Sequence, residues 1–146
     1  MKSKIIKSNL DKKTGLSLVT IQNKYGKFYG CAQCSPEDME TYSQFAGERY
    51  ATLRAYKSFA KFRLKQEKIK LKTIENLIKD IDHDMKGNHH PFDSFSIPMK
   101  KIRLKLRDYK QSVSDWENIY NFYEQEIKKQ DEDRQAVLNR AKVKKD

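Results

Sequence analysis

The sequence predicts an α+β protein in which an N-terminal β-hairpin or meander docks onto a long antiparallel hairpin of two coiled-coil helices. Strand-like segments occupy the first 34 residues, a long stretch without strong helix breakers follows Pro36, and apolar residues are regularly spaced from Met99 to Ile127. The expected parts are a β region over 1–34 and a helical hairpin over 35–146, with helices at about 36–86 and 98–140, in one folding unit.

The first 34 residues contain three segments that are typical of β-strands. Ile5 and Ile6 lie in the first segment, the β-branched run Leu16–Gln22 is the second, and residues 27–34 form the third. A turn is expected at 23–26, because Gly26 can adopt the positive φ that tight hairpin turns require. A sheet of this size is only marginally stable alone, so we expect it to pack against the helices.

The third strand-like segment carries the signal for that packing. Phe28, Gly30, Ala32 and Cys34 alternate along the segment and therefore share one face of the strand. Their side chains decrease from an aromatic ring to small groups, which predicts that a helix approaches this strand closely.

Two long helices are predicted after the strands. Ser35 can cap the first helix, and Pro36 suits its first position. In the second helix, apolar residues recur in alternating steps of three and four, which is the spacing of a coiled-coil seam. A break near Val113, where Ser114 and Glu117 could form a capping box, is the alternative to one continuous second helix. The predicted seam residues are Leu64, Leu71, Ile74, Ile78, Ile81 and Met85 in the first helix, with Glu67 intruding, and Met99, Ile102, Leu106, Tyr109, Val113, Trp116, Tyr120, Tyr123 and Ile127 in the second.

Charge is distributed in blocks whose sign alternates along the chain. If the helices fold back near residues 91–92, two positions face each other when their numbers add up to about 183. The block 49–72, of net charge +8, then lies opposite 111–134, of net charge −4, and the block 99–110, of net charge +5, lies opposite the acids of 75–84. This complementarity supports the hairpin and predicts that much of the positive charge is neutralised within the protein.

The composition indicates a soluble, helix-rich protein with an acidic partner. Charged residues make up 35% of the 146 residues, the formal net charge is +11 and the mean hydropathy is −0.94. So strong a positive balance favours binding to a polyanion or an acidic surface. The sequence contains neither a run of about 18 apolar residues nor the apolar core of a signal peptide, so we expect a cytoplasmic protein without a membrane partner.

Motifs that support catalysis or cofactor binding are missing from the sequence. There is no phosphate-binding glycine loop, no nucleophile elbow and no H-E-x-x-H, so we expect no enzymatic activity and no cofactor. Cys31 and Cys34 could belong to a zinc site, but the only histidines, His83, His89 and His90, lie one helix length away in sequence. We therefore expect structural cysteines and no metal within one chain, although a site shared between chains stays open. The loop histidines with Asp93 could bind a divalent cation, but their spacing fits no zinc signature.

Two short motifs lie at the end of the third strand and in the following helix. The first is Gly30-x-Ala32-x-Cys34-x-Pro36-Glu37-Asp38, and the second is Gly47-x-x-x-Ala51-x-x-Arg54-Ala55. Together they cover about 26 of the 146 residues and resemble a pattern in small phage and prophage accessory proteins, with a longer interval between the halves here. The resemblance implies a phage-encoded protein, and many such proteins bind and inhibit host machinery.

The densest basic region, residues 49–72, contains nine cations, one acid and several aromatic residues. Tyr56, Phe59 and Phe62 could stack on nucleic-acid bases if they were exposed, but at helical spacing such residues more often form a core. The residues that we expect to bind a partner are Lys24, Tyr25, Lys27, Tyr29, Arg49, Arg54, Lys57, Lys61, Arg63 and Lys65.

These features predict a non-enzymatic, phage-type accessory protein that binds and modulates a host protein that handles nucleic acids. An anti-defence inhibitor, such as an anti-CRISPR protein, is the concrete form of this prediction, and its partner could be a nuclease or a nucleoprotein complex. Direct, largely sequence-nonspecific binding of nucleic acid is one alternative, and a helical structural or assembly factor is another. The sequence leaves the oligomeric state open.

Overall fold

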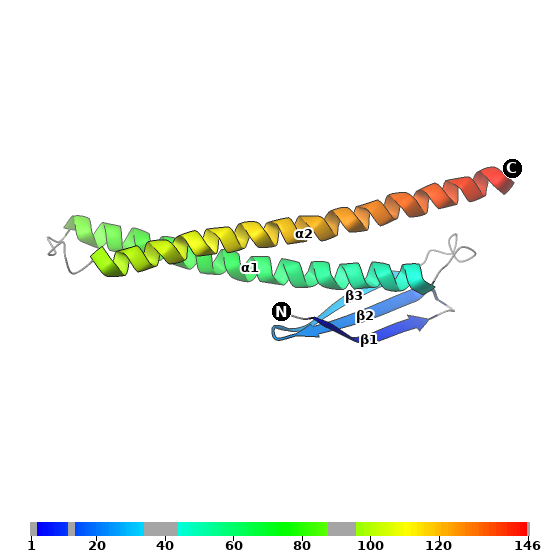
Figure 1. Cartoon of the computed structure of the whole chain (residues 1–146), viewed down its shortest axis with the longest axis horizontal. Helices are drawn as coiled ribbons and strands as arrows, with labels where there is room; N and C mark the ends of the chain where they lie inside the picture. The colour runs from blue at the N-terminus through cyan, green and yellow to red at the C-terminus, as the bar shows by residue number, and fades with distance from the viewer. Residues whose placement is uncertain (1–2, 12–13, 34–43, 88–95, 146) are drawn as a thin grey trace. The chain divides into compact units, whose positions relative to one another are not determined.

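A computed structural model describes residues 3–11, 14–33, 44–87 and 96–145 of the chain (Figure 1). The predicted α+β fold, an N-terminal antiparallel sheet docked on a hairpin of two long helices, is confirmed. The elements are β1 (Lys4–Asp11), β2 (Leu16–Asn23), β3 (Gly26–Gln33), α1 (Gln44–Gly87) and α2 (Ser96–Lys145).

The helix ends differ in detail from those expected. The helix start predicted at Ser35–Pro36 lies outside the described residues, in which α1 begins at Gln44. The second helix begins two residues before the expected position 98 and continues to Lys145. It passes through Val113 and Ser114 without interruption, so the alternative of a break near these residues is wrong.

Contacts between residues divide the chain into two compact units. The sheet unit comprises residues 1–60 and 119–146, and therefore contains the three strands with the first part of α1 and the last part of α2. The hairpin unit comprises residues 61–118, which contain the remaining parts of both helices.

The sheet has the strand order β1-β2-β3, and both strand pairs are antiparallel. The turn between β2 and β3 is the predicted one, with a φ of 127° at Gly26 and the amide of Tyr25 donating to Asn23 Oδ1 at 2.8 Å. Gly15, with a φ of 71°, serves the turn before β2. β2 and β3 pair along their whole length, whereas the pairing of β1 with β2 has a register shift between Ile5 and Lys7.

One face of the sheet packs against α1 in the sheet unit (Figure 1). Val19 and Ile21 on β2 are fully buried, as are Ala51 and Ala55 on α1. The contact is closest at Gly30, where an added Cβ would lie 1.9 Å from the carbonyl oxygen of Ala51 and 2.4 Å from the amide nitrogen of Ala55. The predicted close approach of a helix to the tapering face of β3 is therefore confirmed.

Side chains of α1 also bond to the backbone of β3, which is an edge strand of the sheet. Arg54 Nη1 donates to the carbonyl oxygen of Cys31 at 2.9 Å, and Ser58 Oγ donates to that of Tyr29 at 3.5 Å. Exposed edge strands can pair with other chains, and these bonds occupy two of the acceptors that such pairing would use.

The helices of the sheet unit run antiparallel. Tyr56 stacks on Tyr123 with ring centroids 5.7 Å apart, Lys57 Nζ lies 3.7 Å from Glu124 Oε1, and the Tyr50 hydroxyl donates to Asp131. The numbers in these pairs add up to 179 or 181, close to the predicted sum of about 183.

The hairpin unit packs its helices through the predicted seam. Every predicted seam residue from Leu64 to Ile81 in α1 and from Met99 to Trp116 in α2 is half-buried, and the intruding Glu67 is buried. Leu104, which lies outside the seam spacing, is 53% exposed. The three-and-four spacing therefore identifies the side of each helix that packs.

Replacing Leu106 by Asp should destabilise the hairpin unit, because it places a carboxylate in the half-buried seam. We expect a loss of about 1–3 kcal/mol in the free energy of unfolding, and a similar loss for Ile78→Asp on the facing helix. The matched control is Leu104→Asp, the same change on the exposed side of α2, which should cost about 0.5 kcal/mol or less. Urea unfolding followed by circular dichroism measures all three, and equal losses for Leu106→Asp and Leu104→Asp would contradict the seam.

Replacing Gly30 by Ala should separate β3 from α1, because the new Cβ overlaps the helix backbone rather than a side chain that could move. Overpacking of this kind costs about 1–3 kcal/mol or more. Cys31→Ala is the control, since Cys31 is exposed and only its carbonyl group bonds to α1. Thermal unfolding compares the two variants, and a Gly30→Ala protein as stable as the control would refute the close approach.

Candidate functional site

The candidate residues of the β2–β3 hairpin lie on the surface of the sheet unit. Lys24 and Lys27 are exposed, and Tyr29 is 59% exposed. Tyr25 is half-buried, with its ring centroid 6.0 Å from that of Phe59 and with Lys24 Nζ 5.1 Å from its own ring centre. The hairpin therefore presents two cations and a tyrosine above a turn that is anchored to α1 through Tyr25.

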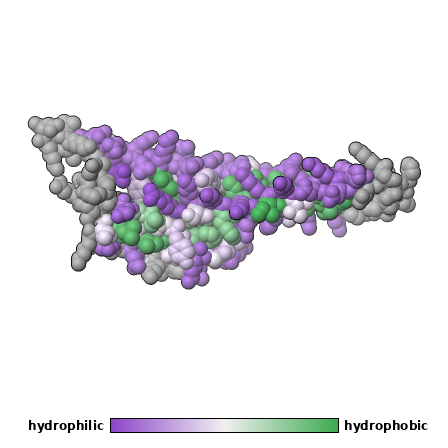
Figure 2. Space-filling model, turned by 180° about the vertical axis from the view of Figure 1, so that it is seen from behind, coloured by the Kyte–Doolittle hydropathy of each residue, from purple (hydrophilic) through white to green (hydrophobic). Residues whose placement is uncertain are grey.

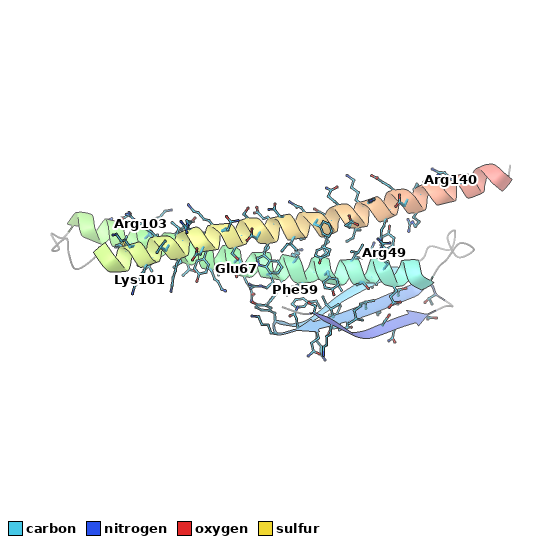
Figure 3. The ribbon with its side chains drawn as sticks, viewed as in Figure 1. Arg49, Phe59, Glu67, Lys101, Arg103 and Arg140 are labelled. Carbon is cyan, nitrogen blue, oxygen red and sulfur yellow. The ribbon has the colours of Figure 1, made fainter. Side chains whose placement is uncertain are left out.

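The candidate cations of the first part of α1 are used differently. Arg49 is exposed (Figure 3). Arg54, in contrast, combines its bond to the carbonyl oxygen of Cys31 with a position 5.6 Å from the ring centre of Tyr50. Lys57 is half-buried between Glu124 and the ring of Tyr120, whose centre is 5.5 Å from Nζ. The charges of Arg54 and Lys57 thus contribute to packing within the sheet unit. No contact of this kind is found for Arg49 among the described residues.

In the hairpin unit, Lys61 and Lys65 are exposed but Arg63 is buried. The Arg63 guanidinium lies 3.0 Å from Glu67 Oε1, donates to Gln66 Oε1 at 2.7 Å and sits 5.2 Å above the ring of Trp116. The same carboxylate of Glu67 receives Lys70 at 3.3 Å. Arg63 therefore neutralises the acid that intrudes into the seam, and its charge is not presented to a partner.

Of the three rings that could have stacked on bases, Tyr56, Phe59 and Phe62, two follow the core interpretation. Phe59 is buried under the sheet, with its ring centroid 5.0 Å from that of Phe28 (Figure 3). Tyr56 is half-buried on Tyr123, and Phe62 is the one that stays exposed. Stacking of bases on this helix face would need rings that the fold already uses.

Burial raises the pKa of Tyr50, and the hydrogen bond to the Asp131 carboxylate raises it further, since both disfavour the phenolate. Burial also raises the pKa of Tyr123, with a smaller contribution from Tyr56. Both tyrosines therefore stay protonated near neutral pH, where Tyr50 donates to Asp131 and Tyr123 packs on Tyr56.

The predicted charge pairing between the helices holds for one pair of blocks. Lys57–Glu124 in the sheet unit and Lys68–Glu117 in the hairpin unit, at 3.7 and 3.8 Å, both join the block 49–72 to the block 111–134. In the described part of the chain, however, no ion pair joins the cations of 99–110 to Glu75, Asp80 or Asp82. Asp84, the fourth predicted partner, has its side chain outside the described residues.

The block 99–110 therefore presents positive charge, in contrast to the neutralisation that the facing acids predict. Its cations are all exposed, and it contains a single acid, Asp108. The sequence shows six cations within these twelve residues, but the acids at the facing positions predict that their charge is neutralised. The six residues are Lys100, Lys101, Arg103, Lys105, Arg107 and Lys110.

The predicted metal sites fall mostly outside the described residues. Cys34, His89, His90 and Asp93 lie there, whereas Cys31 is an exposed free cysteine. Within the described ranges no three His, Cys, Asp or Glu side chains are grouped closely enough to hold a metal ion. In the same ranges, neither helix is apolar enough along its length to cross a membrane.

No protein-family model matches the chain, and no curated protein or solved structure is significantly similar to it. Among the described residues, the two short motifs nevertheless meet in the sheet unit, where Gly30 approaches Ala51 and Ala55 and Arg54 bonds to the carbonyl oxygen of Cys31. These motif positions are used to pack the third strand on the helix. An interaction surface must therefore be sought among the exposed residues around them.

Proposed function

We propose that the protein is a non-enzymatic accessory protein, of the kind that phages encode, which binds and modulates a host protein that handles nucleic acids. The proposed site of action is the cytoplasm of a bacterial host, and an anti-defence inhibitor, such as an anti-CRISPR protein, is the specific form. The observation that carries the proposal is the outer face of the sheet, which combines exposed apolar and aromatic groups with cations.

The strand register brings these groups together. Tyr29 pairs with Thr20, and Leu18 pairs with Cys31, so Leu18 and Tyr29 are neighbours on the face opposite to the buried Val19 and Ile21. Lys27, two residues before Tyr29, shares this face, and its partner Gln22 pairs in turn with Lys4. On this surface, Tyr29 and Leu18 can bury apolar area against a partner, and Lys27 and Lys4 can attract an acidic partner over a longer distance.

The chemistry of this surface fits an acidic patch on a protein. Tyrosine is enriched among residues that dominate protein interfaces, because it buries a large area at a low cost in side-chain entropy. The lysines would raise the rate of encounter with an acidic surface, such as the carboxylates around the active site of a nuclease.

The alternative route to nucleic acid through residues 49–72 receives less support from the same contacts. Lys57, Arg63, Lys68 and Lys70 each lie within 4 Å of a carboxylate oxygen, and the rings of Tyr56 and Phe59 are packed. Four of the nine cations in this block are thus paired with carboxylates, and Arg54 bonds to the sheet.

The proposal predicts separate effects of the lysines and of Tyr29 on binding to a partner captured from nuclease-treated bacterial lysate. Lys24→Glu combined with Lys27→Glu should slow association about tenfold or more, and the effect should shrink at high salt. Tyr29→Ala should mainly speed dissociation, by about tenfold, because it removes the anchor. Surface plasmon resonance with the captured partner measures both rates.

The matched control is Lys128→Glu with Lys129→Glu, which makes the same change in net charge at exposed positions of α2. This variant should bind like the unchanged protein. Loss of partner capture in the control, or full retention in both sheet variants, would remove the outer face of the sheet from the proposal.

A further inference from the structure

We infer that a row of four cations on α2, namely Lys100, Arg103, Arg107 and Lys110, binds the phosphate backbone of double-stranded nucleic acid. The inference concerns the hairpin unit and is independent of the function proposed for the sheet unit. It starts from the finding that these four side chains are exposed and have no carboxylate within ion-pair distance among the described residues.

The row follows from the register of the seam. Each of the four cations comes directly after a seam residue, so the row has the same steps of three, four and three as Met99, Ile102, Leu106 and Tyr109. Residues at this spacing lie on one side of a helix. The row therefore runs along the flank of the seam and spans ten residues, or about 15 Å at a rise of 1.5 Å per residue.

The flank of α2 on which the row lies also explains why its cations have no ion pair among the described residues. Farther along α2 it carries Glu117, which pairs with Lys68 on α1. From Lys68, helical spacing continues the facing flank of α1 through Lys72, Glu75, Lys79 and Asp82, which are two cations and two acids. The flank that faces the row thus has no net negative charge to neutralise it.

The single acid of the block lies away from the row. Asp108 follows Lys101 and Lys105 in steps of four and three, which places it on the opposite flank of α2. Leu104, the exposed apolar residue of this segment, lies between the two flanks on the side away from the seam. The row is therefore uniformly positive and has no apolar anchor within it.

A uniformly positive row fits a regular line of phosphates better than it fits a protein surface. Duplex DNA carries about one negative charge per 1.7 Å of its axis, so about nine phosphates occupy the roughly 15 Å that the row spans. Protein interfaces depend on apolar or aromatic anchors in their centre, and the row offers none. Contacts to phosphate do not read bases, so the binding should be independent of sequence.

The test uses the full chain and a labelled DNA duplex of arbitrary sequence, with binding followed by fluorescence anisotropy over a series of salt concentrations. If the row neutralises four phosphates, the logarithm of the association constant should fall with the logarithm of salt with a slope of about −4. Replacing Lys100, Arg103, Arg107 and Lys110 by Gln should weaken binding at least tenfold at low salt and bring the slope close to zero. Circular dichroism verifies that this variant keeps its helices.

The control lowers the net charge by the same amount elsewhere on α2, through replacement by Gln of the exposed Arg140 (Figure 3), Lys128, Lys129 and Arg134. It should retain duplex binding within about threefold and keep most of the salt slope.

Equal weakening in both variants would show that only net charge matters, and unchanged binding in the row variant would place the duplex elsewhere. Either result overturns the inference. Failure of the unchanged protein to bind the duplex at low salt overturns it as well. The Lys24→Glu, Lys27→Glu variant should bind the duplex normally, which separates this test from that of the proposed function.

Discussion

The alternating three- and four-residue spacing of apolar residues in α2 is the constraint on which the helical part of the structure depends. It decides which side of the helix packs, and therefore which residues stand on the two flanks. In the sheet unit it brings Tyr123 onto Tyr56, and in the hairpin unit it brings Trp116 under the guanidinium of Arg63. The charged residues take their roles from this register, because a cation beside the seam is neutralised only where the facing flank supplies an acid.

A second constraint joins the sheet to α1. Gly30 allows the backbone of β3 to touch the backbone of α1 at Ala51 and Ala55, and Arg54 then reaches the carbonyl oxygen of Cys31. The two short motifs of the sequence meet at this point, so their spacing reflects packing in the residues that are described. Because the inner face of the sheet is committed to α1, the face with Leu18, Lys27 and Tyr29 is the one that remains for a partner.

Patterns with a strict geometric meaning could be interpreted from the sequence alone. Alternation along β3 predicted the close helix, the glycine in the turn predicted the positive φ at Gly26, and the apolar spacing predicted the seam from Met99 onward.

Charge was harder to interpret, because a count of cations and acids fixes the sign of a block but not the distances within it. Arg63 looked like a surface cation and is buried, since it neutralises Glu67 inside the seam. The acids at the facing positions predict that the cations of 99–110 are neutralised. In the described residues these cations have no ion pair, because acids and cations alternate on the facing flank of α1. On the face seen in Figure 2, hydrophilic residues surround separate hydrophobic patches, and hydropathy alone does not distinguish engaged from free charges.

A regular row of cations without ion-pair partners among the described residues, rather than net charge, should bind the duplex. Amide chemical-shift mapping of the isotope-labelled full chain during titration with a short DNA duplex tests it most directly. We expect the largest shifts on residues 100–110, while the amides of Lys24–Tyr29 and those around Lys57 and Arg63 change little. Shifts spread evenly over all basic segments, or concentrated on residues 49–72, would contradict it.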